Sequence, residues 1–390
     1  MKRIVKNPKR LMTVLKLIIP VIILVLLFVL PSLLTRQAAD FYGTNLFPVI
    51  SLFFNVLSGS VQMSITENIV VVGGIILFIL VIVFVIKFFA KLLGRGGAIR
   101  FAVNTISTIL IIAIPFTAVY QLMHGIGFRR TPVVTLMKLP GKKYTIDDYM
   151  EALDWAYYNM VTARTKLGED YRGVAHLSSS FETTCEYANG LIDAFSEEYD
   201  IGLSRNFIRG KPVSLSKYWS LTRIVGMYDA FLGEANINTG YMDVTSFPVT
   251  VCHEVCHAKG FASETDCNII AVIACTMSNR QDFRYAGYYY IFWELYGIVY
   301  NYVRHNGGKL PEYMNSEAMK QVYRDMSASE SYWKNIDEMW LSELIAELSD
   351  DANDAFLKAN GTEGISTYQI PRDIYLDYYM IYVKPLNKKG

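Results

Sequence analysis

Three long apolar stretches near the start of the chain most constrain what it can fold into. Residues 17–34 and 69–86 contain no charged side chain, and residues 101–123 contain none either, although Asn104 interrupts their apolar run. A helix of about 20 apolar residues is long enough to cross a bilayer. The chain is 52% hydrophobic and only 19% charged, which favours an integral membrane protein. The sequence therefore predicts a membrane domain over residues 1–123 with three transmembrane helices.

The lysines and arginines around these stretches predict their orientation. The connection over residues 35–68 has only Arg36. Basic residues concentrate instead before the first stretch and between the second and the third, at Lys2, Arg3, Lys6, Lys9, Arg10, Lys87, Lys91, Arg95 and Arg100. Because positively charged loops stay in the cytoplasm, we expect a cytoplasmic N-terminus and an extracytoplasmic domain over residues 124–390. A cleaved signal peptide is the competing interpretation of the first stretch.

The pentapeptide His253-Glu254-Val255-Cys256-His257 is the strongest indication of chemistry. On a helix, two histidines four residues apart project from one face and can bind one metal ion. Glu254 lies beside them, where its carboxylate can take a proton from water that the metal activates. Zinc is the ion typical of this pattern. The alternative is that both histidines pack within the helix or cap it.

Helix start and stop signals frame this motif. Pro248 suits a first helical turn and Gly260 suits the left-handed residue after a helix, so we predict the motif helix over residues 248–259. Ser263 can cap a second helix, which puts Glu264 in the first turn of that helix. The helix dipole favours a carboxylate there, and two histidines leave a catalytic zinc one protein ligand short. Glu264 is therefore the predicted third ligand.

Two neighbours of Glu264 are further candidates for the same site. Asp266 is a rival ligand, but we expect its side chain to complete a capping box with Ser263. Asn268 lies one turn beyond Glu264 on the same helix face, where it could orient the ligand carboxylate or a histidine. The alternative for Asn268 is a solvated or packing residue.

This arrangement resembles the gluzincin zinc metallopeptidases, in which a glutamate on the next helix follows H-E-x-x-H. The longer segments are similar to a bacterial membrane-protein family of uncharacterised function, which has three N-terminal membrane helices and an external H-E-x-x-H domain. These segments are Gly233–Asn238, Phe247–Glu264, Phe283–Gly287 and Phe356–Tyr368. The resemblance implies one Zn²⁺ per chain, held by His253, His257 and Glu264. It also implies that Glu254 is the general base and that the membrane is the bacterial plasma membrane.

The resemblance implies two further parts of a peptidase site. In gluzincins a sheet edge beside the zinc can bind a peptide as an added strand. The predicted substrate-binding edge consists of Ala235, Asn236, Ile237 and Asn238, with a plain loop as the alternative. A histidine or tyrosine after the motif generally stabilises the oxyanion. The available residues are His305, Tyr285, Tyr288 and Tyr368, and we favour Tyr285 and Tyr368 as catalytic residues, although most tyrosines in this chain are expected to pack.

Residues 124–390 read as one mainly helical domain. Helical patterns follow Thr145 and Ser180 and cover residues 340–355 and 371–382. The best strand pattern covers residues 234–241. Residues 285–303 look hydrophobic, but their many tyrosines and Glu294 favour a buried or interfacial helix over another membrane span. We predict a membrane protein whose external part is a mainly α (α+β), gluzincin-like zinc-peptidase domain with a small sheet.

The cysteines and the net charge bear on three further features: disulfides, a cysteine-ligated metal site and nucleic-acid binding. Four of the five cysteines crowd the two predicted metal-site helices, at Cys252, Cys256, Cys267 and Cys275. Their spacing along straight helices is poor for disulfides, so we expect small buried hydrophobic residues, with a cysteine-ligated zinc site as the lesser alternative. The net charge of +1 without a basic stripe gives no reason to expect nucleic-acid binding.

The predicted function is that of a membrane-anchored zinc metallopeptidase. It would hydrolyse a peptide or protein of the cell envelope, with the lipid bilayer as its second partner. Two alternatives stay open: a non-catalytic zinc-binding sensor or scaffold, and a zinc amidase that acts on a non-peptide or cell-wall amide. An intact Glu254 argues against the first alternative, because structural zinc does not need a general base.

Overall fold

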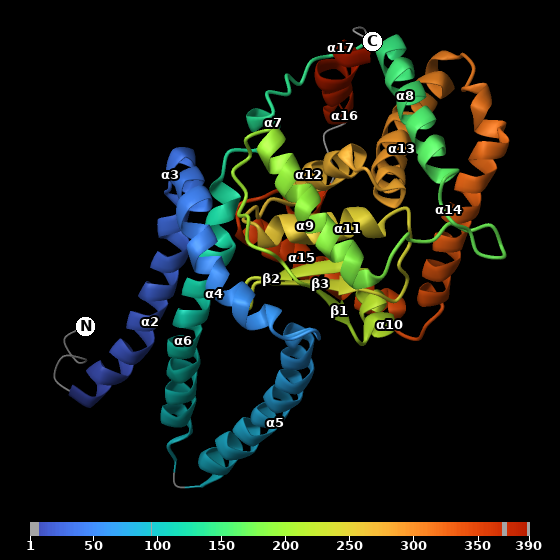
Figure 1. Ribbon diagram of the computed structural model, residues 1–390. Coiled ribbons are helices and arrows are strands. Elements are labelled where there is room, and N and C mark those ends of the chain that lie inside the picture. Colours follow the sequence, from blue (N-terminus) through green and yellow to red (C-terminus); the bar gives the residue numbers. More distant parts are fainter. Residues whose placement is uncertain (1–7, 95, 369–372, 388–390) are drawn as a thin grey trace.

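The computed structural model describes residues 8–94, 96–368 and 373–387, and it combines long apolar helices with a mainly helical body (Figure 1). Helices α2 (Pro8–Ser32), α5 (Ile65–Leu93) and α6 (Ala98–Met123) extend away from the body. The start of α2 lies at the same end of the molecule as the junction between α5 and α6. All three contain the apolar stretches from which membrane helices were predicted.

Among the described residues, four helices are long and apolar enough to cross a membrane, one more than the three expected from the sequence. The additional one covers Arg36–Gly59 and is built from α3 (Arg36–Phe41), a π-helical turn η1 (Tyr42–Leu46) and α4 (Phe47–Gly59). The sequence analysis treated this segment as part of the connection over residues 35–68, because polar residues interrupt its apolar run. It also differs in packing: 28% of its most apolar window is buried, compared with none for α5.

The body is mainly helical, as predicted. Its helices are α7 (Val133–Leu136), α8 (Ile146–Arg164), α9 (Phe181–Glu198), α10 (Ser216–Trp219), α11 (Phe247–Ala258), α12 (Glu264–Met277), α13 (Gln281–Asn306), α14 (Glu317–Asp337), α15 (Ser342–Ala359), α16 (Ile374–Tyr378) and α17 (Lys384–Asn387). Short 3-10 helices are η2 (Gly125–Arg129), η3 (Ser220–Thr222), η4 (Glu312–Asn315) and η5 (Gly364–Tyr368), and η6 (Tyr379–Val383) is a π-helical turn.

Most predicted helices of the body are present. Thr145 and Ser180 cap α8 and α9 with their side chains, and α15 matches the pattern at residues 340–355. The last predicted helix corresponds to α16 and η6, although residues 371–372 lie outside the described residues. Helix α13 carries the tyrosine-rich segment and is not among the candidate membrane helices of the described chain, as expected.

The three-stranded sheet corrects one prediction. Strand β3 (Glu234–Asn238) lies in the middle, parallel to β1 (Gly210–Val213) and antiparallel to β2 (Gly226–Asp229). All five residues of β3 are buried. The expectation that Ala235, Asn236, Ile237 and Asn238 form a substrate-binding edge is therefore wrong, because both sides of that backbone are already paired. Strand β2 is an edge strand, and its short glycine-containing sequence gave no clear strand signal.

The sheet also holds the connection between α4 and α5. Lys211 of β1 is fully buried, and its Nζ donates hydrogen bonds to the carbonyl oxygens of Ser58, at 2.6 Å, and Val61. Glu234 of β3 accepts from the backbone N–H of Thr66 at 2.9 Å, and its carboxylate lies 3.7 Å from Lys211 Nζ. Buried charges need such partners, so the membrane helices and the sheet form one packed unit.

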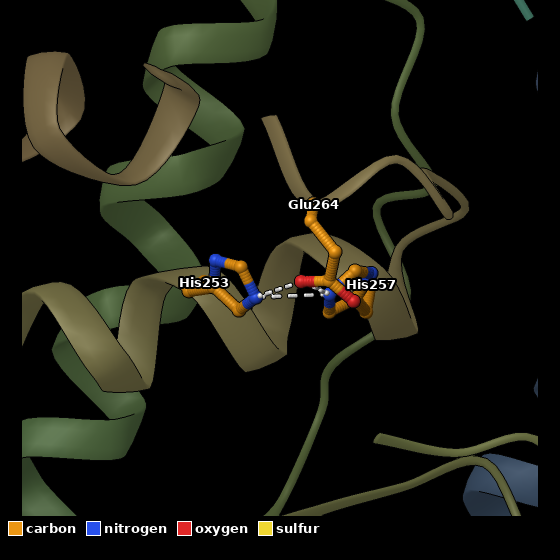
Figure 2. A group of neighbouring side chains, drawn as sticks. All are labelled: His253, His257 and Glu264. Atoms are coloured by element: carbon orange, nitrogen blue, oxygen red, sulfur yellow. Dashed lines mark hydrogen bonds and ion pairs between the residues drawn. The ribbon is translucent and has the colours of Figure 1, made fainter. Parts of the chain in front are cut away.

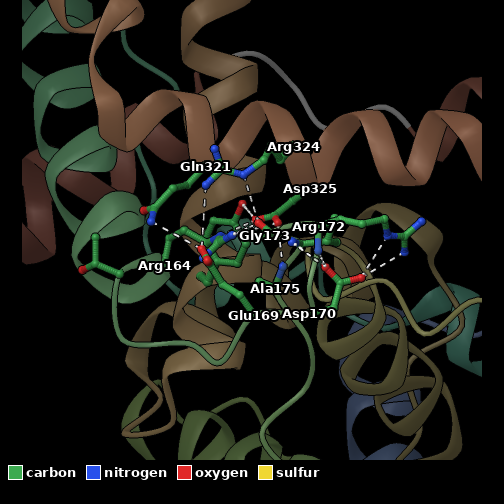
Figure 3. Close-up of polar contacts among 12 residues, drawn as sticks. Arg164, Glu169, Asp170, Arg172, Gly173, Ala175, Gln321, Arg324 and Asp325 are labelled. Atoms are coloured by element: carbon green, nitrogen blue, oxygen red, sulfur yellow. Dashed lines mark hydrogen bonds and ion pairs between the residues drawn. The ribbon is translucent and has the colours of Figure 1, made fainter.

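A second buried ion pair joins helices within the body (Figure 3). Arg164 of α8 and Asp325 of α14 are both almost fully buried and hydrogen-bonded to each other. Arg164 also donates to Glu169 at 2.9 Å and to the carbonyl oxygen of Gly173 at 3.0 Å. Tyr285 of α13 donates its hydroxyl to the same Asp325 carboxylate at 2.8 Å. Tyr285 is therefore part of this structural network.

Replacing the buried Lys211 with methionine is expected to destabilise the protein strongly. Lys211→Met keeps the aliphatic bulk but leaves the Glu234 carboxylate without its buried counter-charge, which costs about 3–5 kcal/mol. The free energy of unfolding in detergent is the measurement. The double variant Lys211→Met/Glu234→Gln should lose less than the single one. The matched control is Lys320→Met, because the Lys320–Glu317 pair is solvent-exposed. An equal effect of Lys211→Met and Lys320→Met would contradict the prediction.

Candidate metal centre

Two consecutive helices present the candidate metal ligands. Helix α11 (Phe247–Ala258) has a proline in its first turn and ends before Gly260, whose φ of +112° is the left-handed conformation expected there. The predicted bounds of the motif helix were correct to within one residue. Helix α12 (Glu264–Met277) follows after five residues, and the hydroxyl of Ser263 caps it by accepting from the N–H of Asp266 at 3.3 Å. Glu264 is thus the first residue of α12.

His253, His257 and Glu264 converge with their side chains (Figure 2). The Nε2 atoms of the two histidines are 2.9 Å apart. Oε2 of Glu264 lies 3.1 Å from Nε2 of His253 and 3.3 Å from Nε2 of His257. Three donors at usual zinc–ligand distances in a tetrahedral arrangement are about 3.3 Å apart. This set of donors therefore has the chemistry and the spacing to hold one divalent metal ion.

The surroundings of His257 orient it as a ligand. Its Nδ1 lies 2.8 Å from the carbonyl oxygen of Phe261, which can only accept a hydrogen bond. Nδ1 therefore carries the hydrogen, and the lone pair is on Nε2, which faces Glu264. Such a backbone partner on the far nitrogen is typical of metal-binding histidines. Nδ1 of His253 is buried and has no hydrogen-bond partner within the described chain.

The charges of the cluster also suit a cation. Burial disfavours a charged His257, but the charge and hydrogen bond of Glu264, together with Glu254, outweigh burial and raise the pKa of His257 to about 10. Burial likewise opposes the Glu264 carboxylate, yet the two histidines hold the pKa of Glu264 below its ordinary value. The protein thus stabilises an anionic glutamate with a positive charge between the donors, and a metal ion can supply that charge in place of a proton.

Glu254 points from α11 toward the edge of the sheet. Its carboxylate is close to β2, because a Cβ atom added at Gly226 would lie 2.5 Å from Oε1 of Glu254. Burial raises the pKa of Glu254, and the nearby histidines and the backbone N–H of Tyr228 only partly offset this. Oε2 of Glu254 is buried without a hydrogen-bond partner among the described residues. A carboxylate in this setting is a stronger base than an exposed one.

Tyr368, one of the two tyrosines favoured as oxyanion donors, lies near the cluster. Its hydroxyl accepts a hydrogen bond from Asn353 at 3.3 Å, and burial and the neighbouring Glu264 carboxylate raise its pKa. The first turns of α12 hold this segment: Thr265 donates to the carbonyl oxygen of Thr367, and Asn268 donates to that of Tyr368 at 3.1 Å. Asn268 therefore supports Tyr368, which corrects the prediction that it orients a metal ligand.

Other candidate residues lie elsewhere. Tyr285 was predicted to be catalytic, but it is buried in the Arg164–Asp325 network. His305 is exposed at the end of α13 and bonds to its own helix. Asp266 accepts from the N–H of Val133 at 2.9 Å, and its carboxylate also interacts with the side chain of Ser263, so it reaches back to the cap and holds the chain before α7 as well. The five cysteines are free and buried, and none belongs to the metal cluster of the described residues.

The sequence analysis missed His124, which directly follows α6. The centre of its ring is 5.7 Å from that of His257 and 5.6 Å from that of Tyr228. Burial and the neighbouring His257 lower the pKa of His124 to about 3, so its imidazole is neutral at physiological pH. No local pattern marks this residue, because only the fold brings the end of α6 to the motif helix.

The described residues define a class of protein with four apolar N-terminal helices and a buried His₂Glu cluster beside a small sheet. The chain belongs to the family described as "Protein of unknown function (DUF3810)", whose model matches residues 42–371. No curated protein and no solved structure matches the chain.

Substitution of the candidate ligands is expected to abolish metal binding. Protein purified without chelators should contain about one zinc ion per chain by elemental analysis. His257→Ala and Glu264→Ala should each contain almost none, because two remaining donors do not hold the ion. His305→Ala is the matched control and should keep its zinc, since His305 is exposed and does not belong to the cluster. Zinc that persists in both ligand variants would contradict this site.

Proposed function

We propose that this protein is a membrane-anchored zinc metallopeptidase of gluzincin type, which cleaves polypeptides of the cell envelope at the extracytoplasmic face. The observation that carries the proposal is the pairing of a His₂Glu donor set with a separate buried carboxylate at a sheet edge. His253, His257 and Glu264 would hold the ion, and Glu254 would be free to act on water. A structural zinc site does not need this fourth side chain.

The residues divide the work of amide hydrolysis. Zinc in this set would supply a Lewis acid that polarises a carbonyl group and acidifies water. Glu254, with its pKa raised by burial, accepts a proton from water as the oxygen bonds to the carbonyl carbon. It then passes a proton to the leaving nitrogen as the C–N bond breaks. The Tyr368 hydroxyl, which lies near Glu264, donates to the oxygen on which negative charge develops.

Strand β2 is the binding edge for the substrate in this proposal. It is an edge strand, and its Gly226 lies against Glu254. The ring of Tyr228 is stacked on His257 at 6.3 Å between ring centres. An extended peptide that pairs with β2 would therefore pass next to both the base and a metal ligand. Strand β2 thus replaces the buried strand β3 as the proposed substrate-binding edge.

The topology that fits this function uses three crossings. Helices α2, α5 and α6 are almost wholly unburied in their apolar windows, as lipid-facing helices are. The segment Arg36–Gly59 is partly buried, and Asn206 of the body donates to the carbonyl oxygen of Pro48 in α4 at 2.6 Å. We therefore place this segment against the body on the extracytoplasmic side. With a cytoplasmic N-terminus, three crossings put the metal centre outside the cytoplasm.

Replacing the proposed base should separate metal binding from hydrolysis. Glu254→Gln keeps the size of the side chain but cannot accept a proton. We therefore expect unchanged zinc content and a loss of cleavage of roughly 10²- to 10⁴-fold. A mixed peptide library incubated with detergent-purified protein, read by mass spectrometry, is the measurement. Stoichiometric zinc without cleavage by the unmutated protein would refute the peptidase and favour a sensor or another amide substrate.

The closeness of β2 to the base gives a second test. Gly226→Ala adds a methyl group where Glu254 Oε1 lies at 2.5 Å, so the carboxylate must move. We expect roughly a 10-fold or larger fall in cleavage, because small displacements of a catalytic group are costly, with zinc content unchanged. Gly190→Ala in α9 is the matched control, since nothing lies within 4 Å of its added Cβ. Equal activity of both variants would show that Glu254 does not depend on β2.

A further inference from the structure

The metal centre is built directly onto the end of a membrane helix. His124 follows the last residue of α6, and its ring is 5.7 Å from that of the ligand His257. Tyr228 of β2 donates its hydroxyl to the carbonyl oxygen of Met123, the last residue of α6, at 3.3 Å. Phe116, about two turns earlier in α6, is 55% exposed. Only about 12 Å of helix axis therefore separates an outward-facing apolar residue from His124.

The edge strand β2 leads from the catalytic base to this lipid-facing surface. At its start, Gly226 abuts the Glu254 carboxylate. Just beyond its end, Phe231 packs edge-on against Phe116 with 5.8 Å between ring centres, and Phe231 is itself 42% exposed. Strand β2 has four residues, Gly226–Asp229, which cover about 13 Å, and Phe231 lies in the turn that follows it. A peptide paired with β2 would thus have one end at the metal centre and the other at the bilayer surface.

A second apolar contact borders the site where α15 meets α6. The ring of Phe356 in α15 is 6.3 Å from that of His124 and 6.0 Å from that of Tyr120. Phe356 is 41% exposed. Asn360, which follows α15, accepts a hydrogen bond from the hydroxyl of Tyr120 at 2.7 Å. Tyrosines such as Tyr120 are typical of the membrane–water interface, so the cluster beside His124 lies close to that interface.

We propose that the substrate is itself anchored in the membrane, and that it is cleaved about five residues outside the bilayer along β2. This rests on the proposed peptidase function and specifies its substrate class. Antiparallel strand pairing is the commoner and more stable arrangement. Strand β2 runs from the metal centre toward the membrane. A peptide that pairs with it antiparallel therefore runs from the membrane toward the metal centre. The anchor therefore lies on the N-terminal side of the cleaved bond, as an acyl chain or a membrane helix would.

A membrane-anchored substrate should be cut at a fixed distance from its anchor, which is not expected for a soluble substrate. An anchor held in the same bilayer raises the effective concentration of the peptide at the site. A tether of one or two residues is too short to reach from the bilayer to Glu254, whereas about five residues in extended form match the length of β2 and its turn. The cut position is then set by distance from the membrane as well as by side-chain preference.

The test uses the full-length protein in lipid nanodiscs with three peptide libraries of the same random sequence. One library carries an N-terminal palmitoyl group, one carries a C-terminal palmitoyl group and one carries none. We expect the N-acylated library to be cleaved about 10-fold faster or more than the unacylated one. Mass spectrometry should place its cuts mainly about four to seven residues from the acylated residue. Glu254→Gln is the control that assigns cleavage to this site.

The possible outcomes separate this inference from the function on which it rests. Equal cleavage of acylated and unacylated libraries, or cuts without a preferred distance from the anchor, would overturn the membrane-anchored substrate while supporting the peptidase. Preference for the C-acylated library would overturn the antiparallel assignment of the anchor. Absence of cleavage in all three libraries, with zinc bound, would overturn both the peptidase function and this inference.

Discussion

The turn between α11 and α12 is the feature on which the candidate metal cluster depends. Gly260 adopts a left-handed conformation that lets α12 begin beside α11, and the carbonyl oxygen of Phe261 fixes the ring of His257. Arg130 holds this turn by donating to the carbonyl oxygens of Gly260, at 3.3 Å, and Ile201, at 3.0 Å. Its guanidinium also lies 4.3 Å from the centre of the Phe261 ring. One buried cation therefore places both a ligand and the helix that carries Glu264.

The same cation connects the cluster to the membrane helices. Arg130 comes seven residues after α6 and lies 3.9 Å from Asp40 of α3, which also accepts from the N–H of Thr131 at 2.9 Å. The sheet makes an equivalent connection through Lys211 and Glu234. Arg130 follows the third apolar stretch, where the positive-inside rule disfavours a basic residue on the extracytoplasmic side, but it is a buried structural residue. The body and the membrane helices are thus one folded unit in which the donors converge.

Local signals in the sequence were enough to predict the donors, and long-range contacts explain what could not be predicted. The proline before the motif, Gly260 and the Ser263 cap act within a few residues, so the two helices and the place of Glu264 could be predicted. Strand β2 could not, because four residues starting with a glycine become an edge strand only by pairing with β3. Tyr285 and Tyr368 are both tyrosines that follow the motif, and no sequence feature favours one of them over the other as the oxyanion donor. Only the fold separates them, placing Tyr285 against Asp325 and Tyr368 near Glu264.

The environment of Glu254 bears on whether the centre is catalytic or structural. Oε2 of Glu254 is buried without a hydrogen-bond partner in the described part of the chain, and such a group destabilises a folded protein by about 1–3 kcal/mol or more. A glutamine at this position would carry a smaller desolvation cost and would fill the same space beside Gly226. A metal site that only stabilises the fold would not need this unfavourable group, because His253, His257 and Glu264 already provide its donors. The destabilising carboxylate is accounted for when its free oxygen takes part in proton transfer, and unpaired groups of this kind concentrate at functional sites.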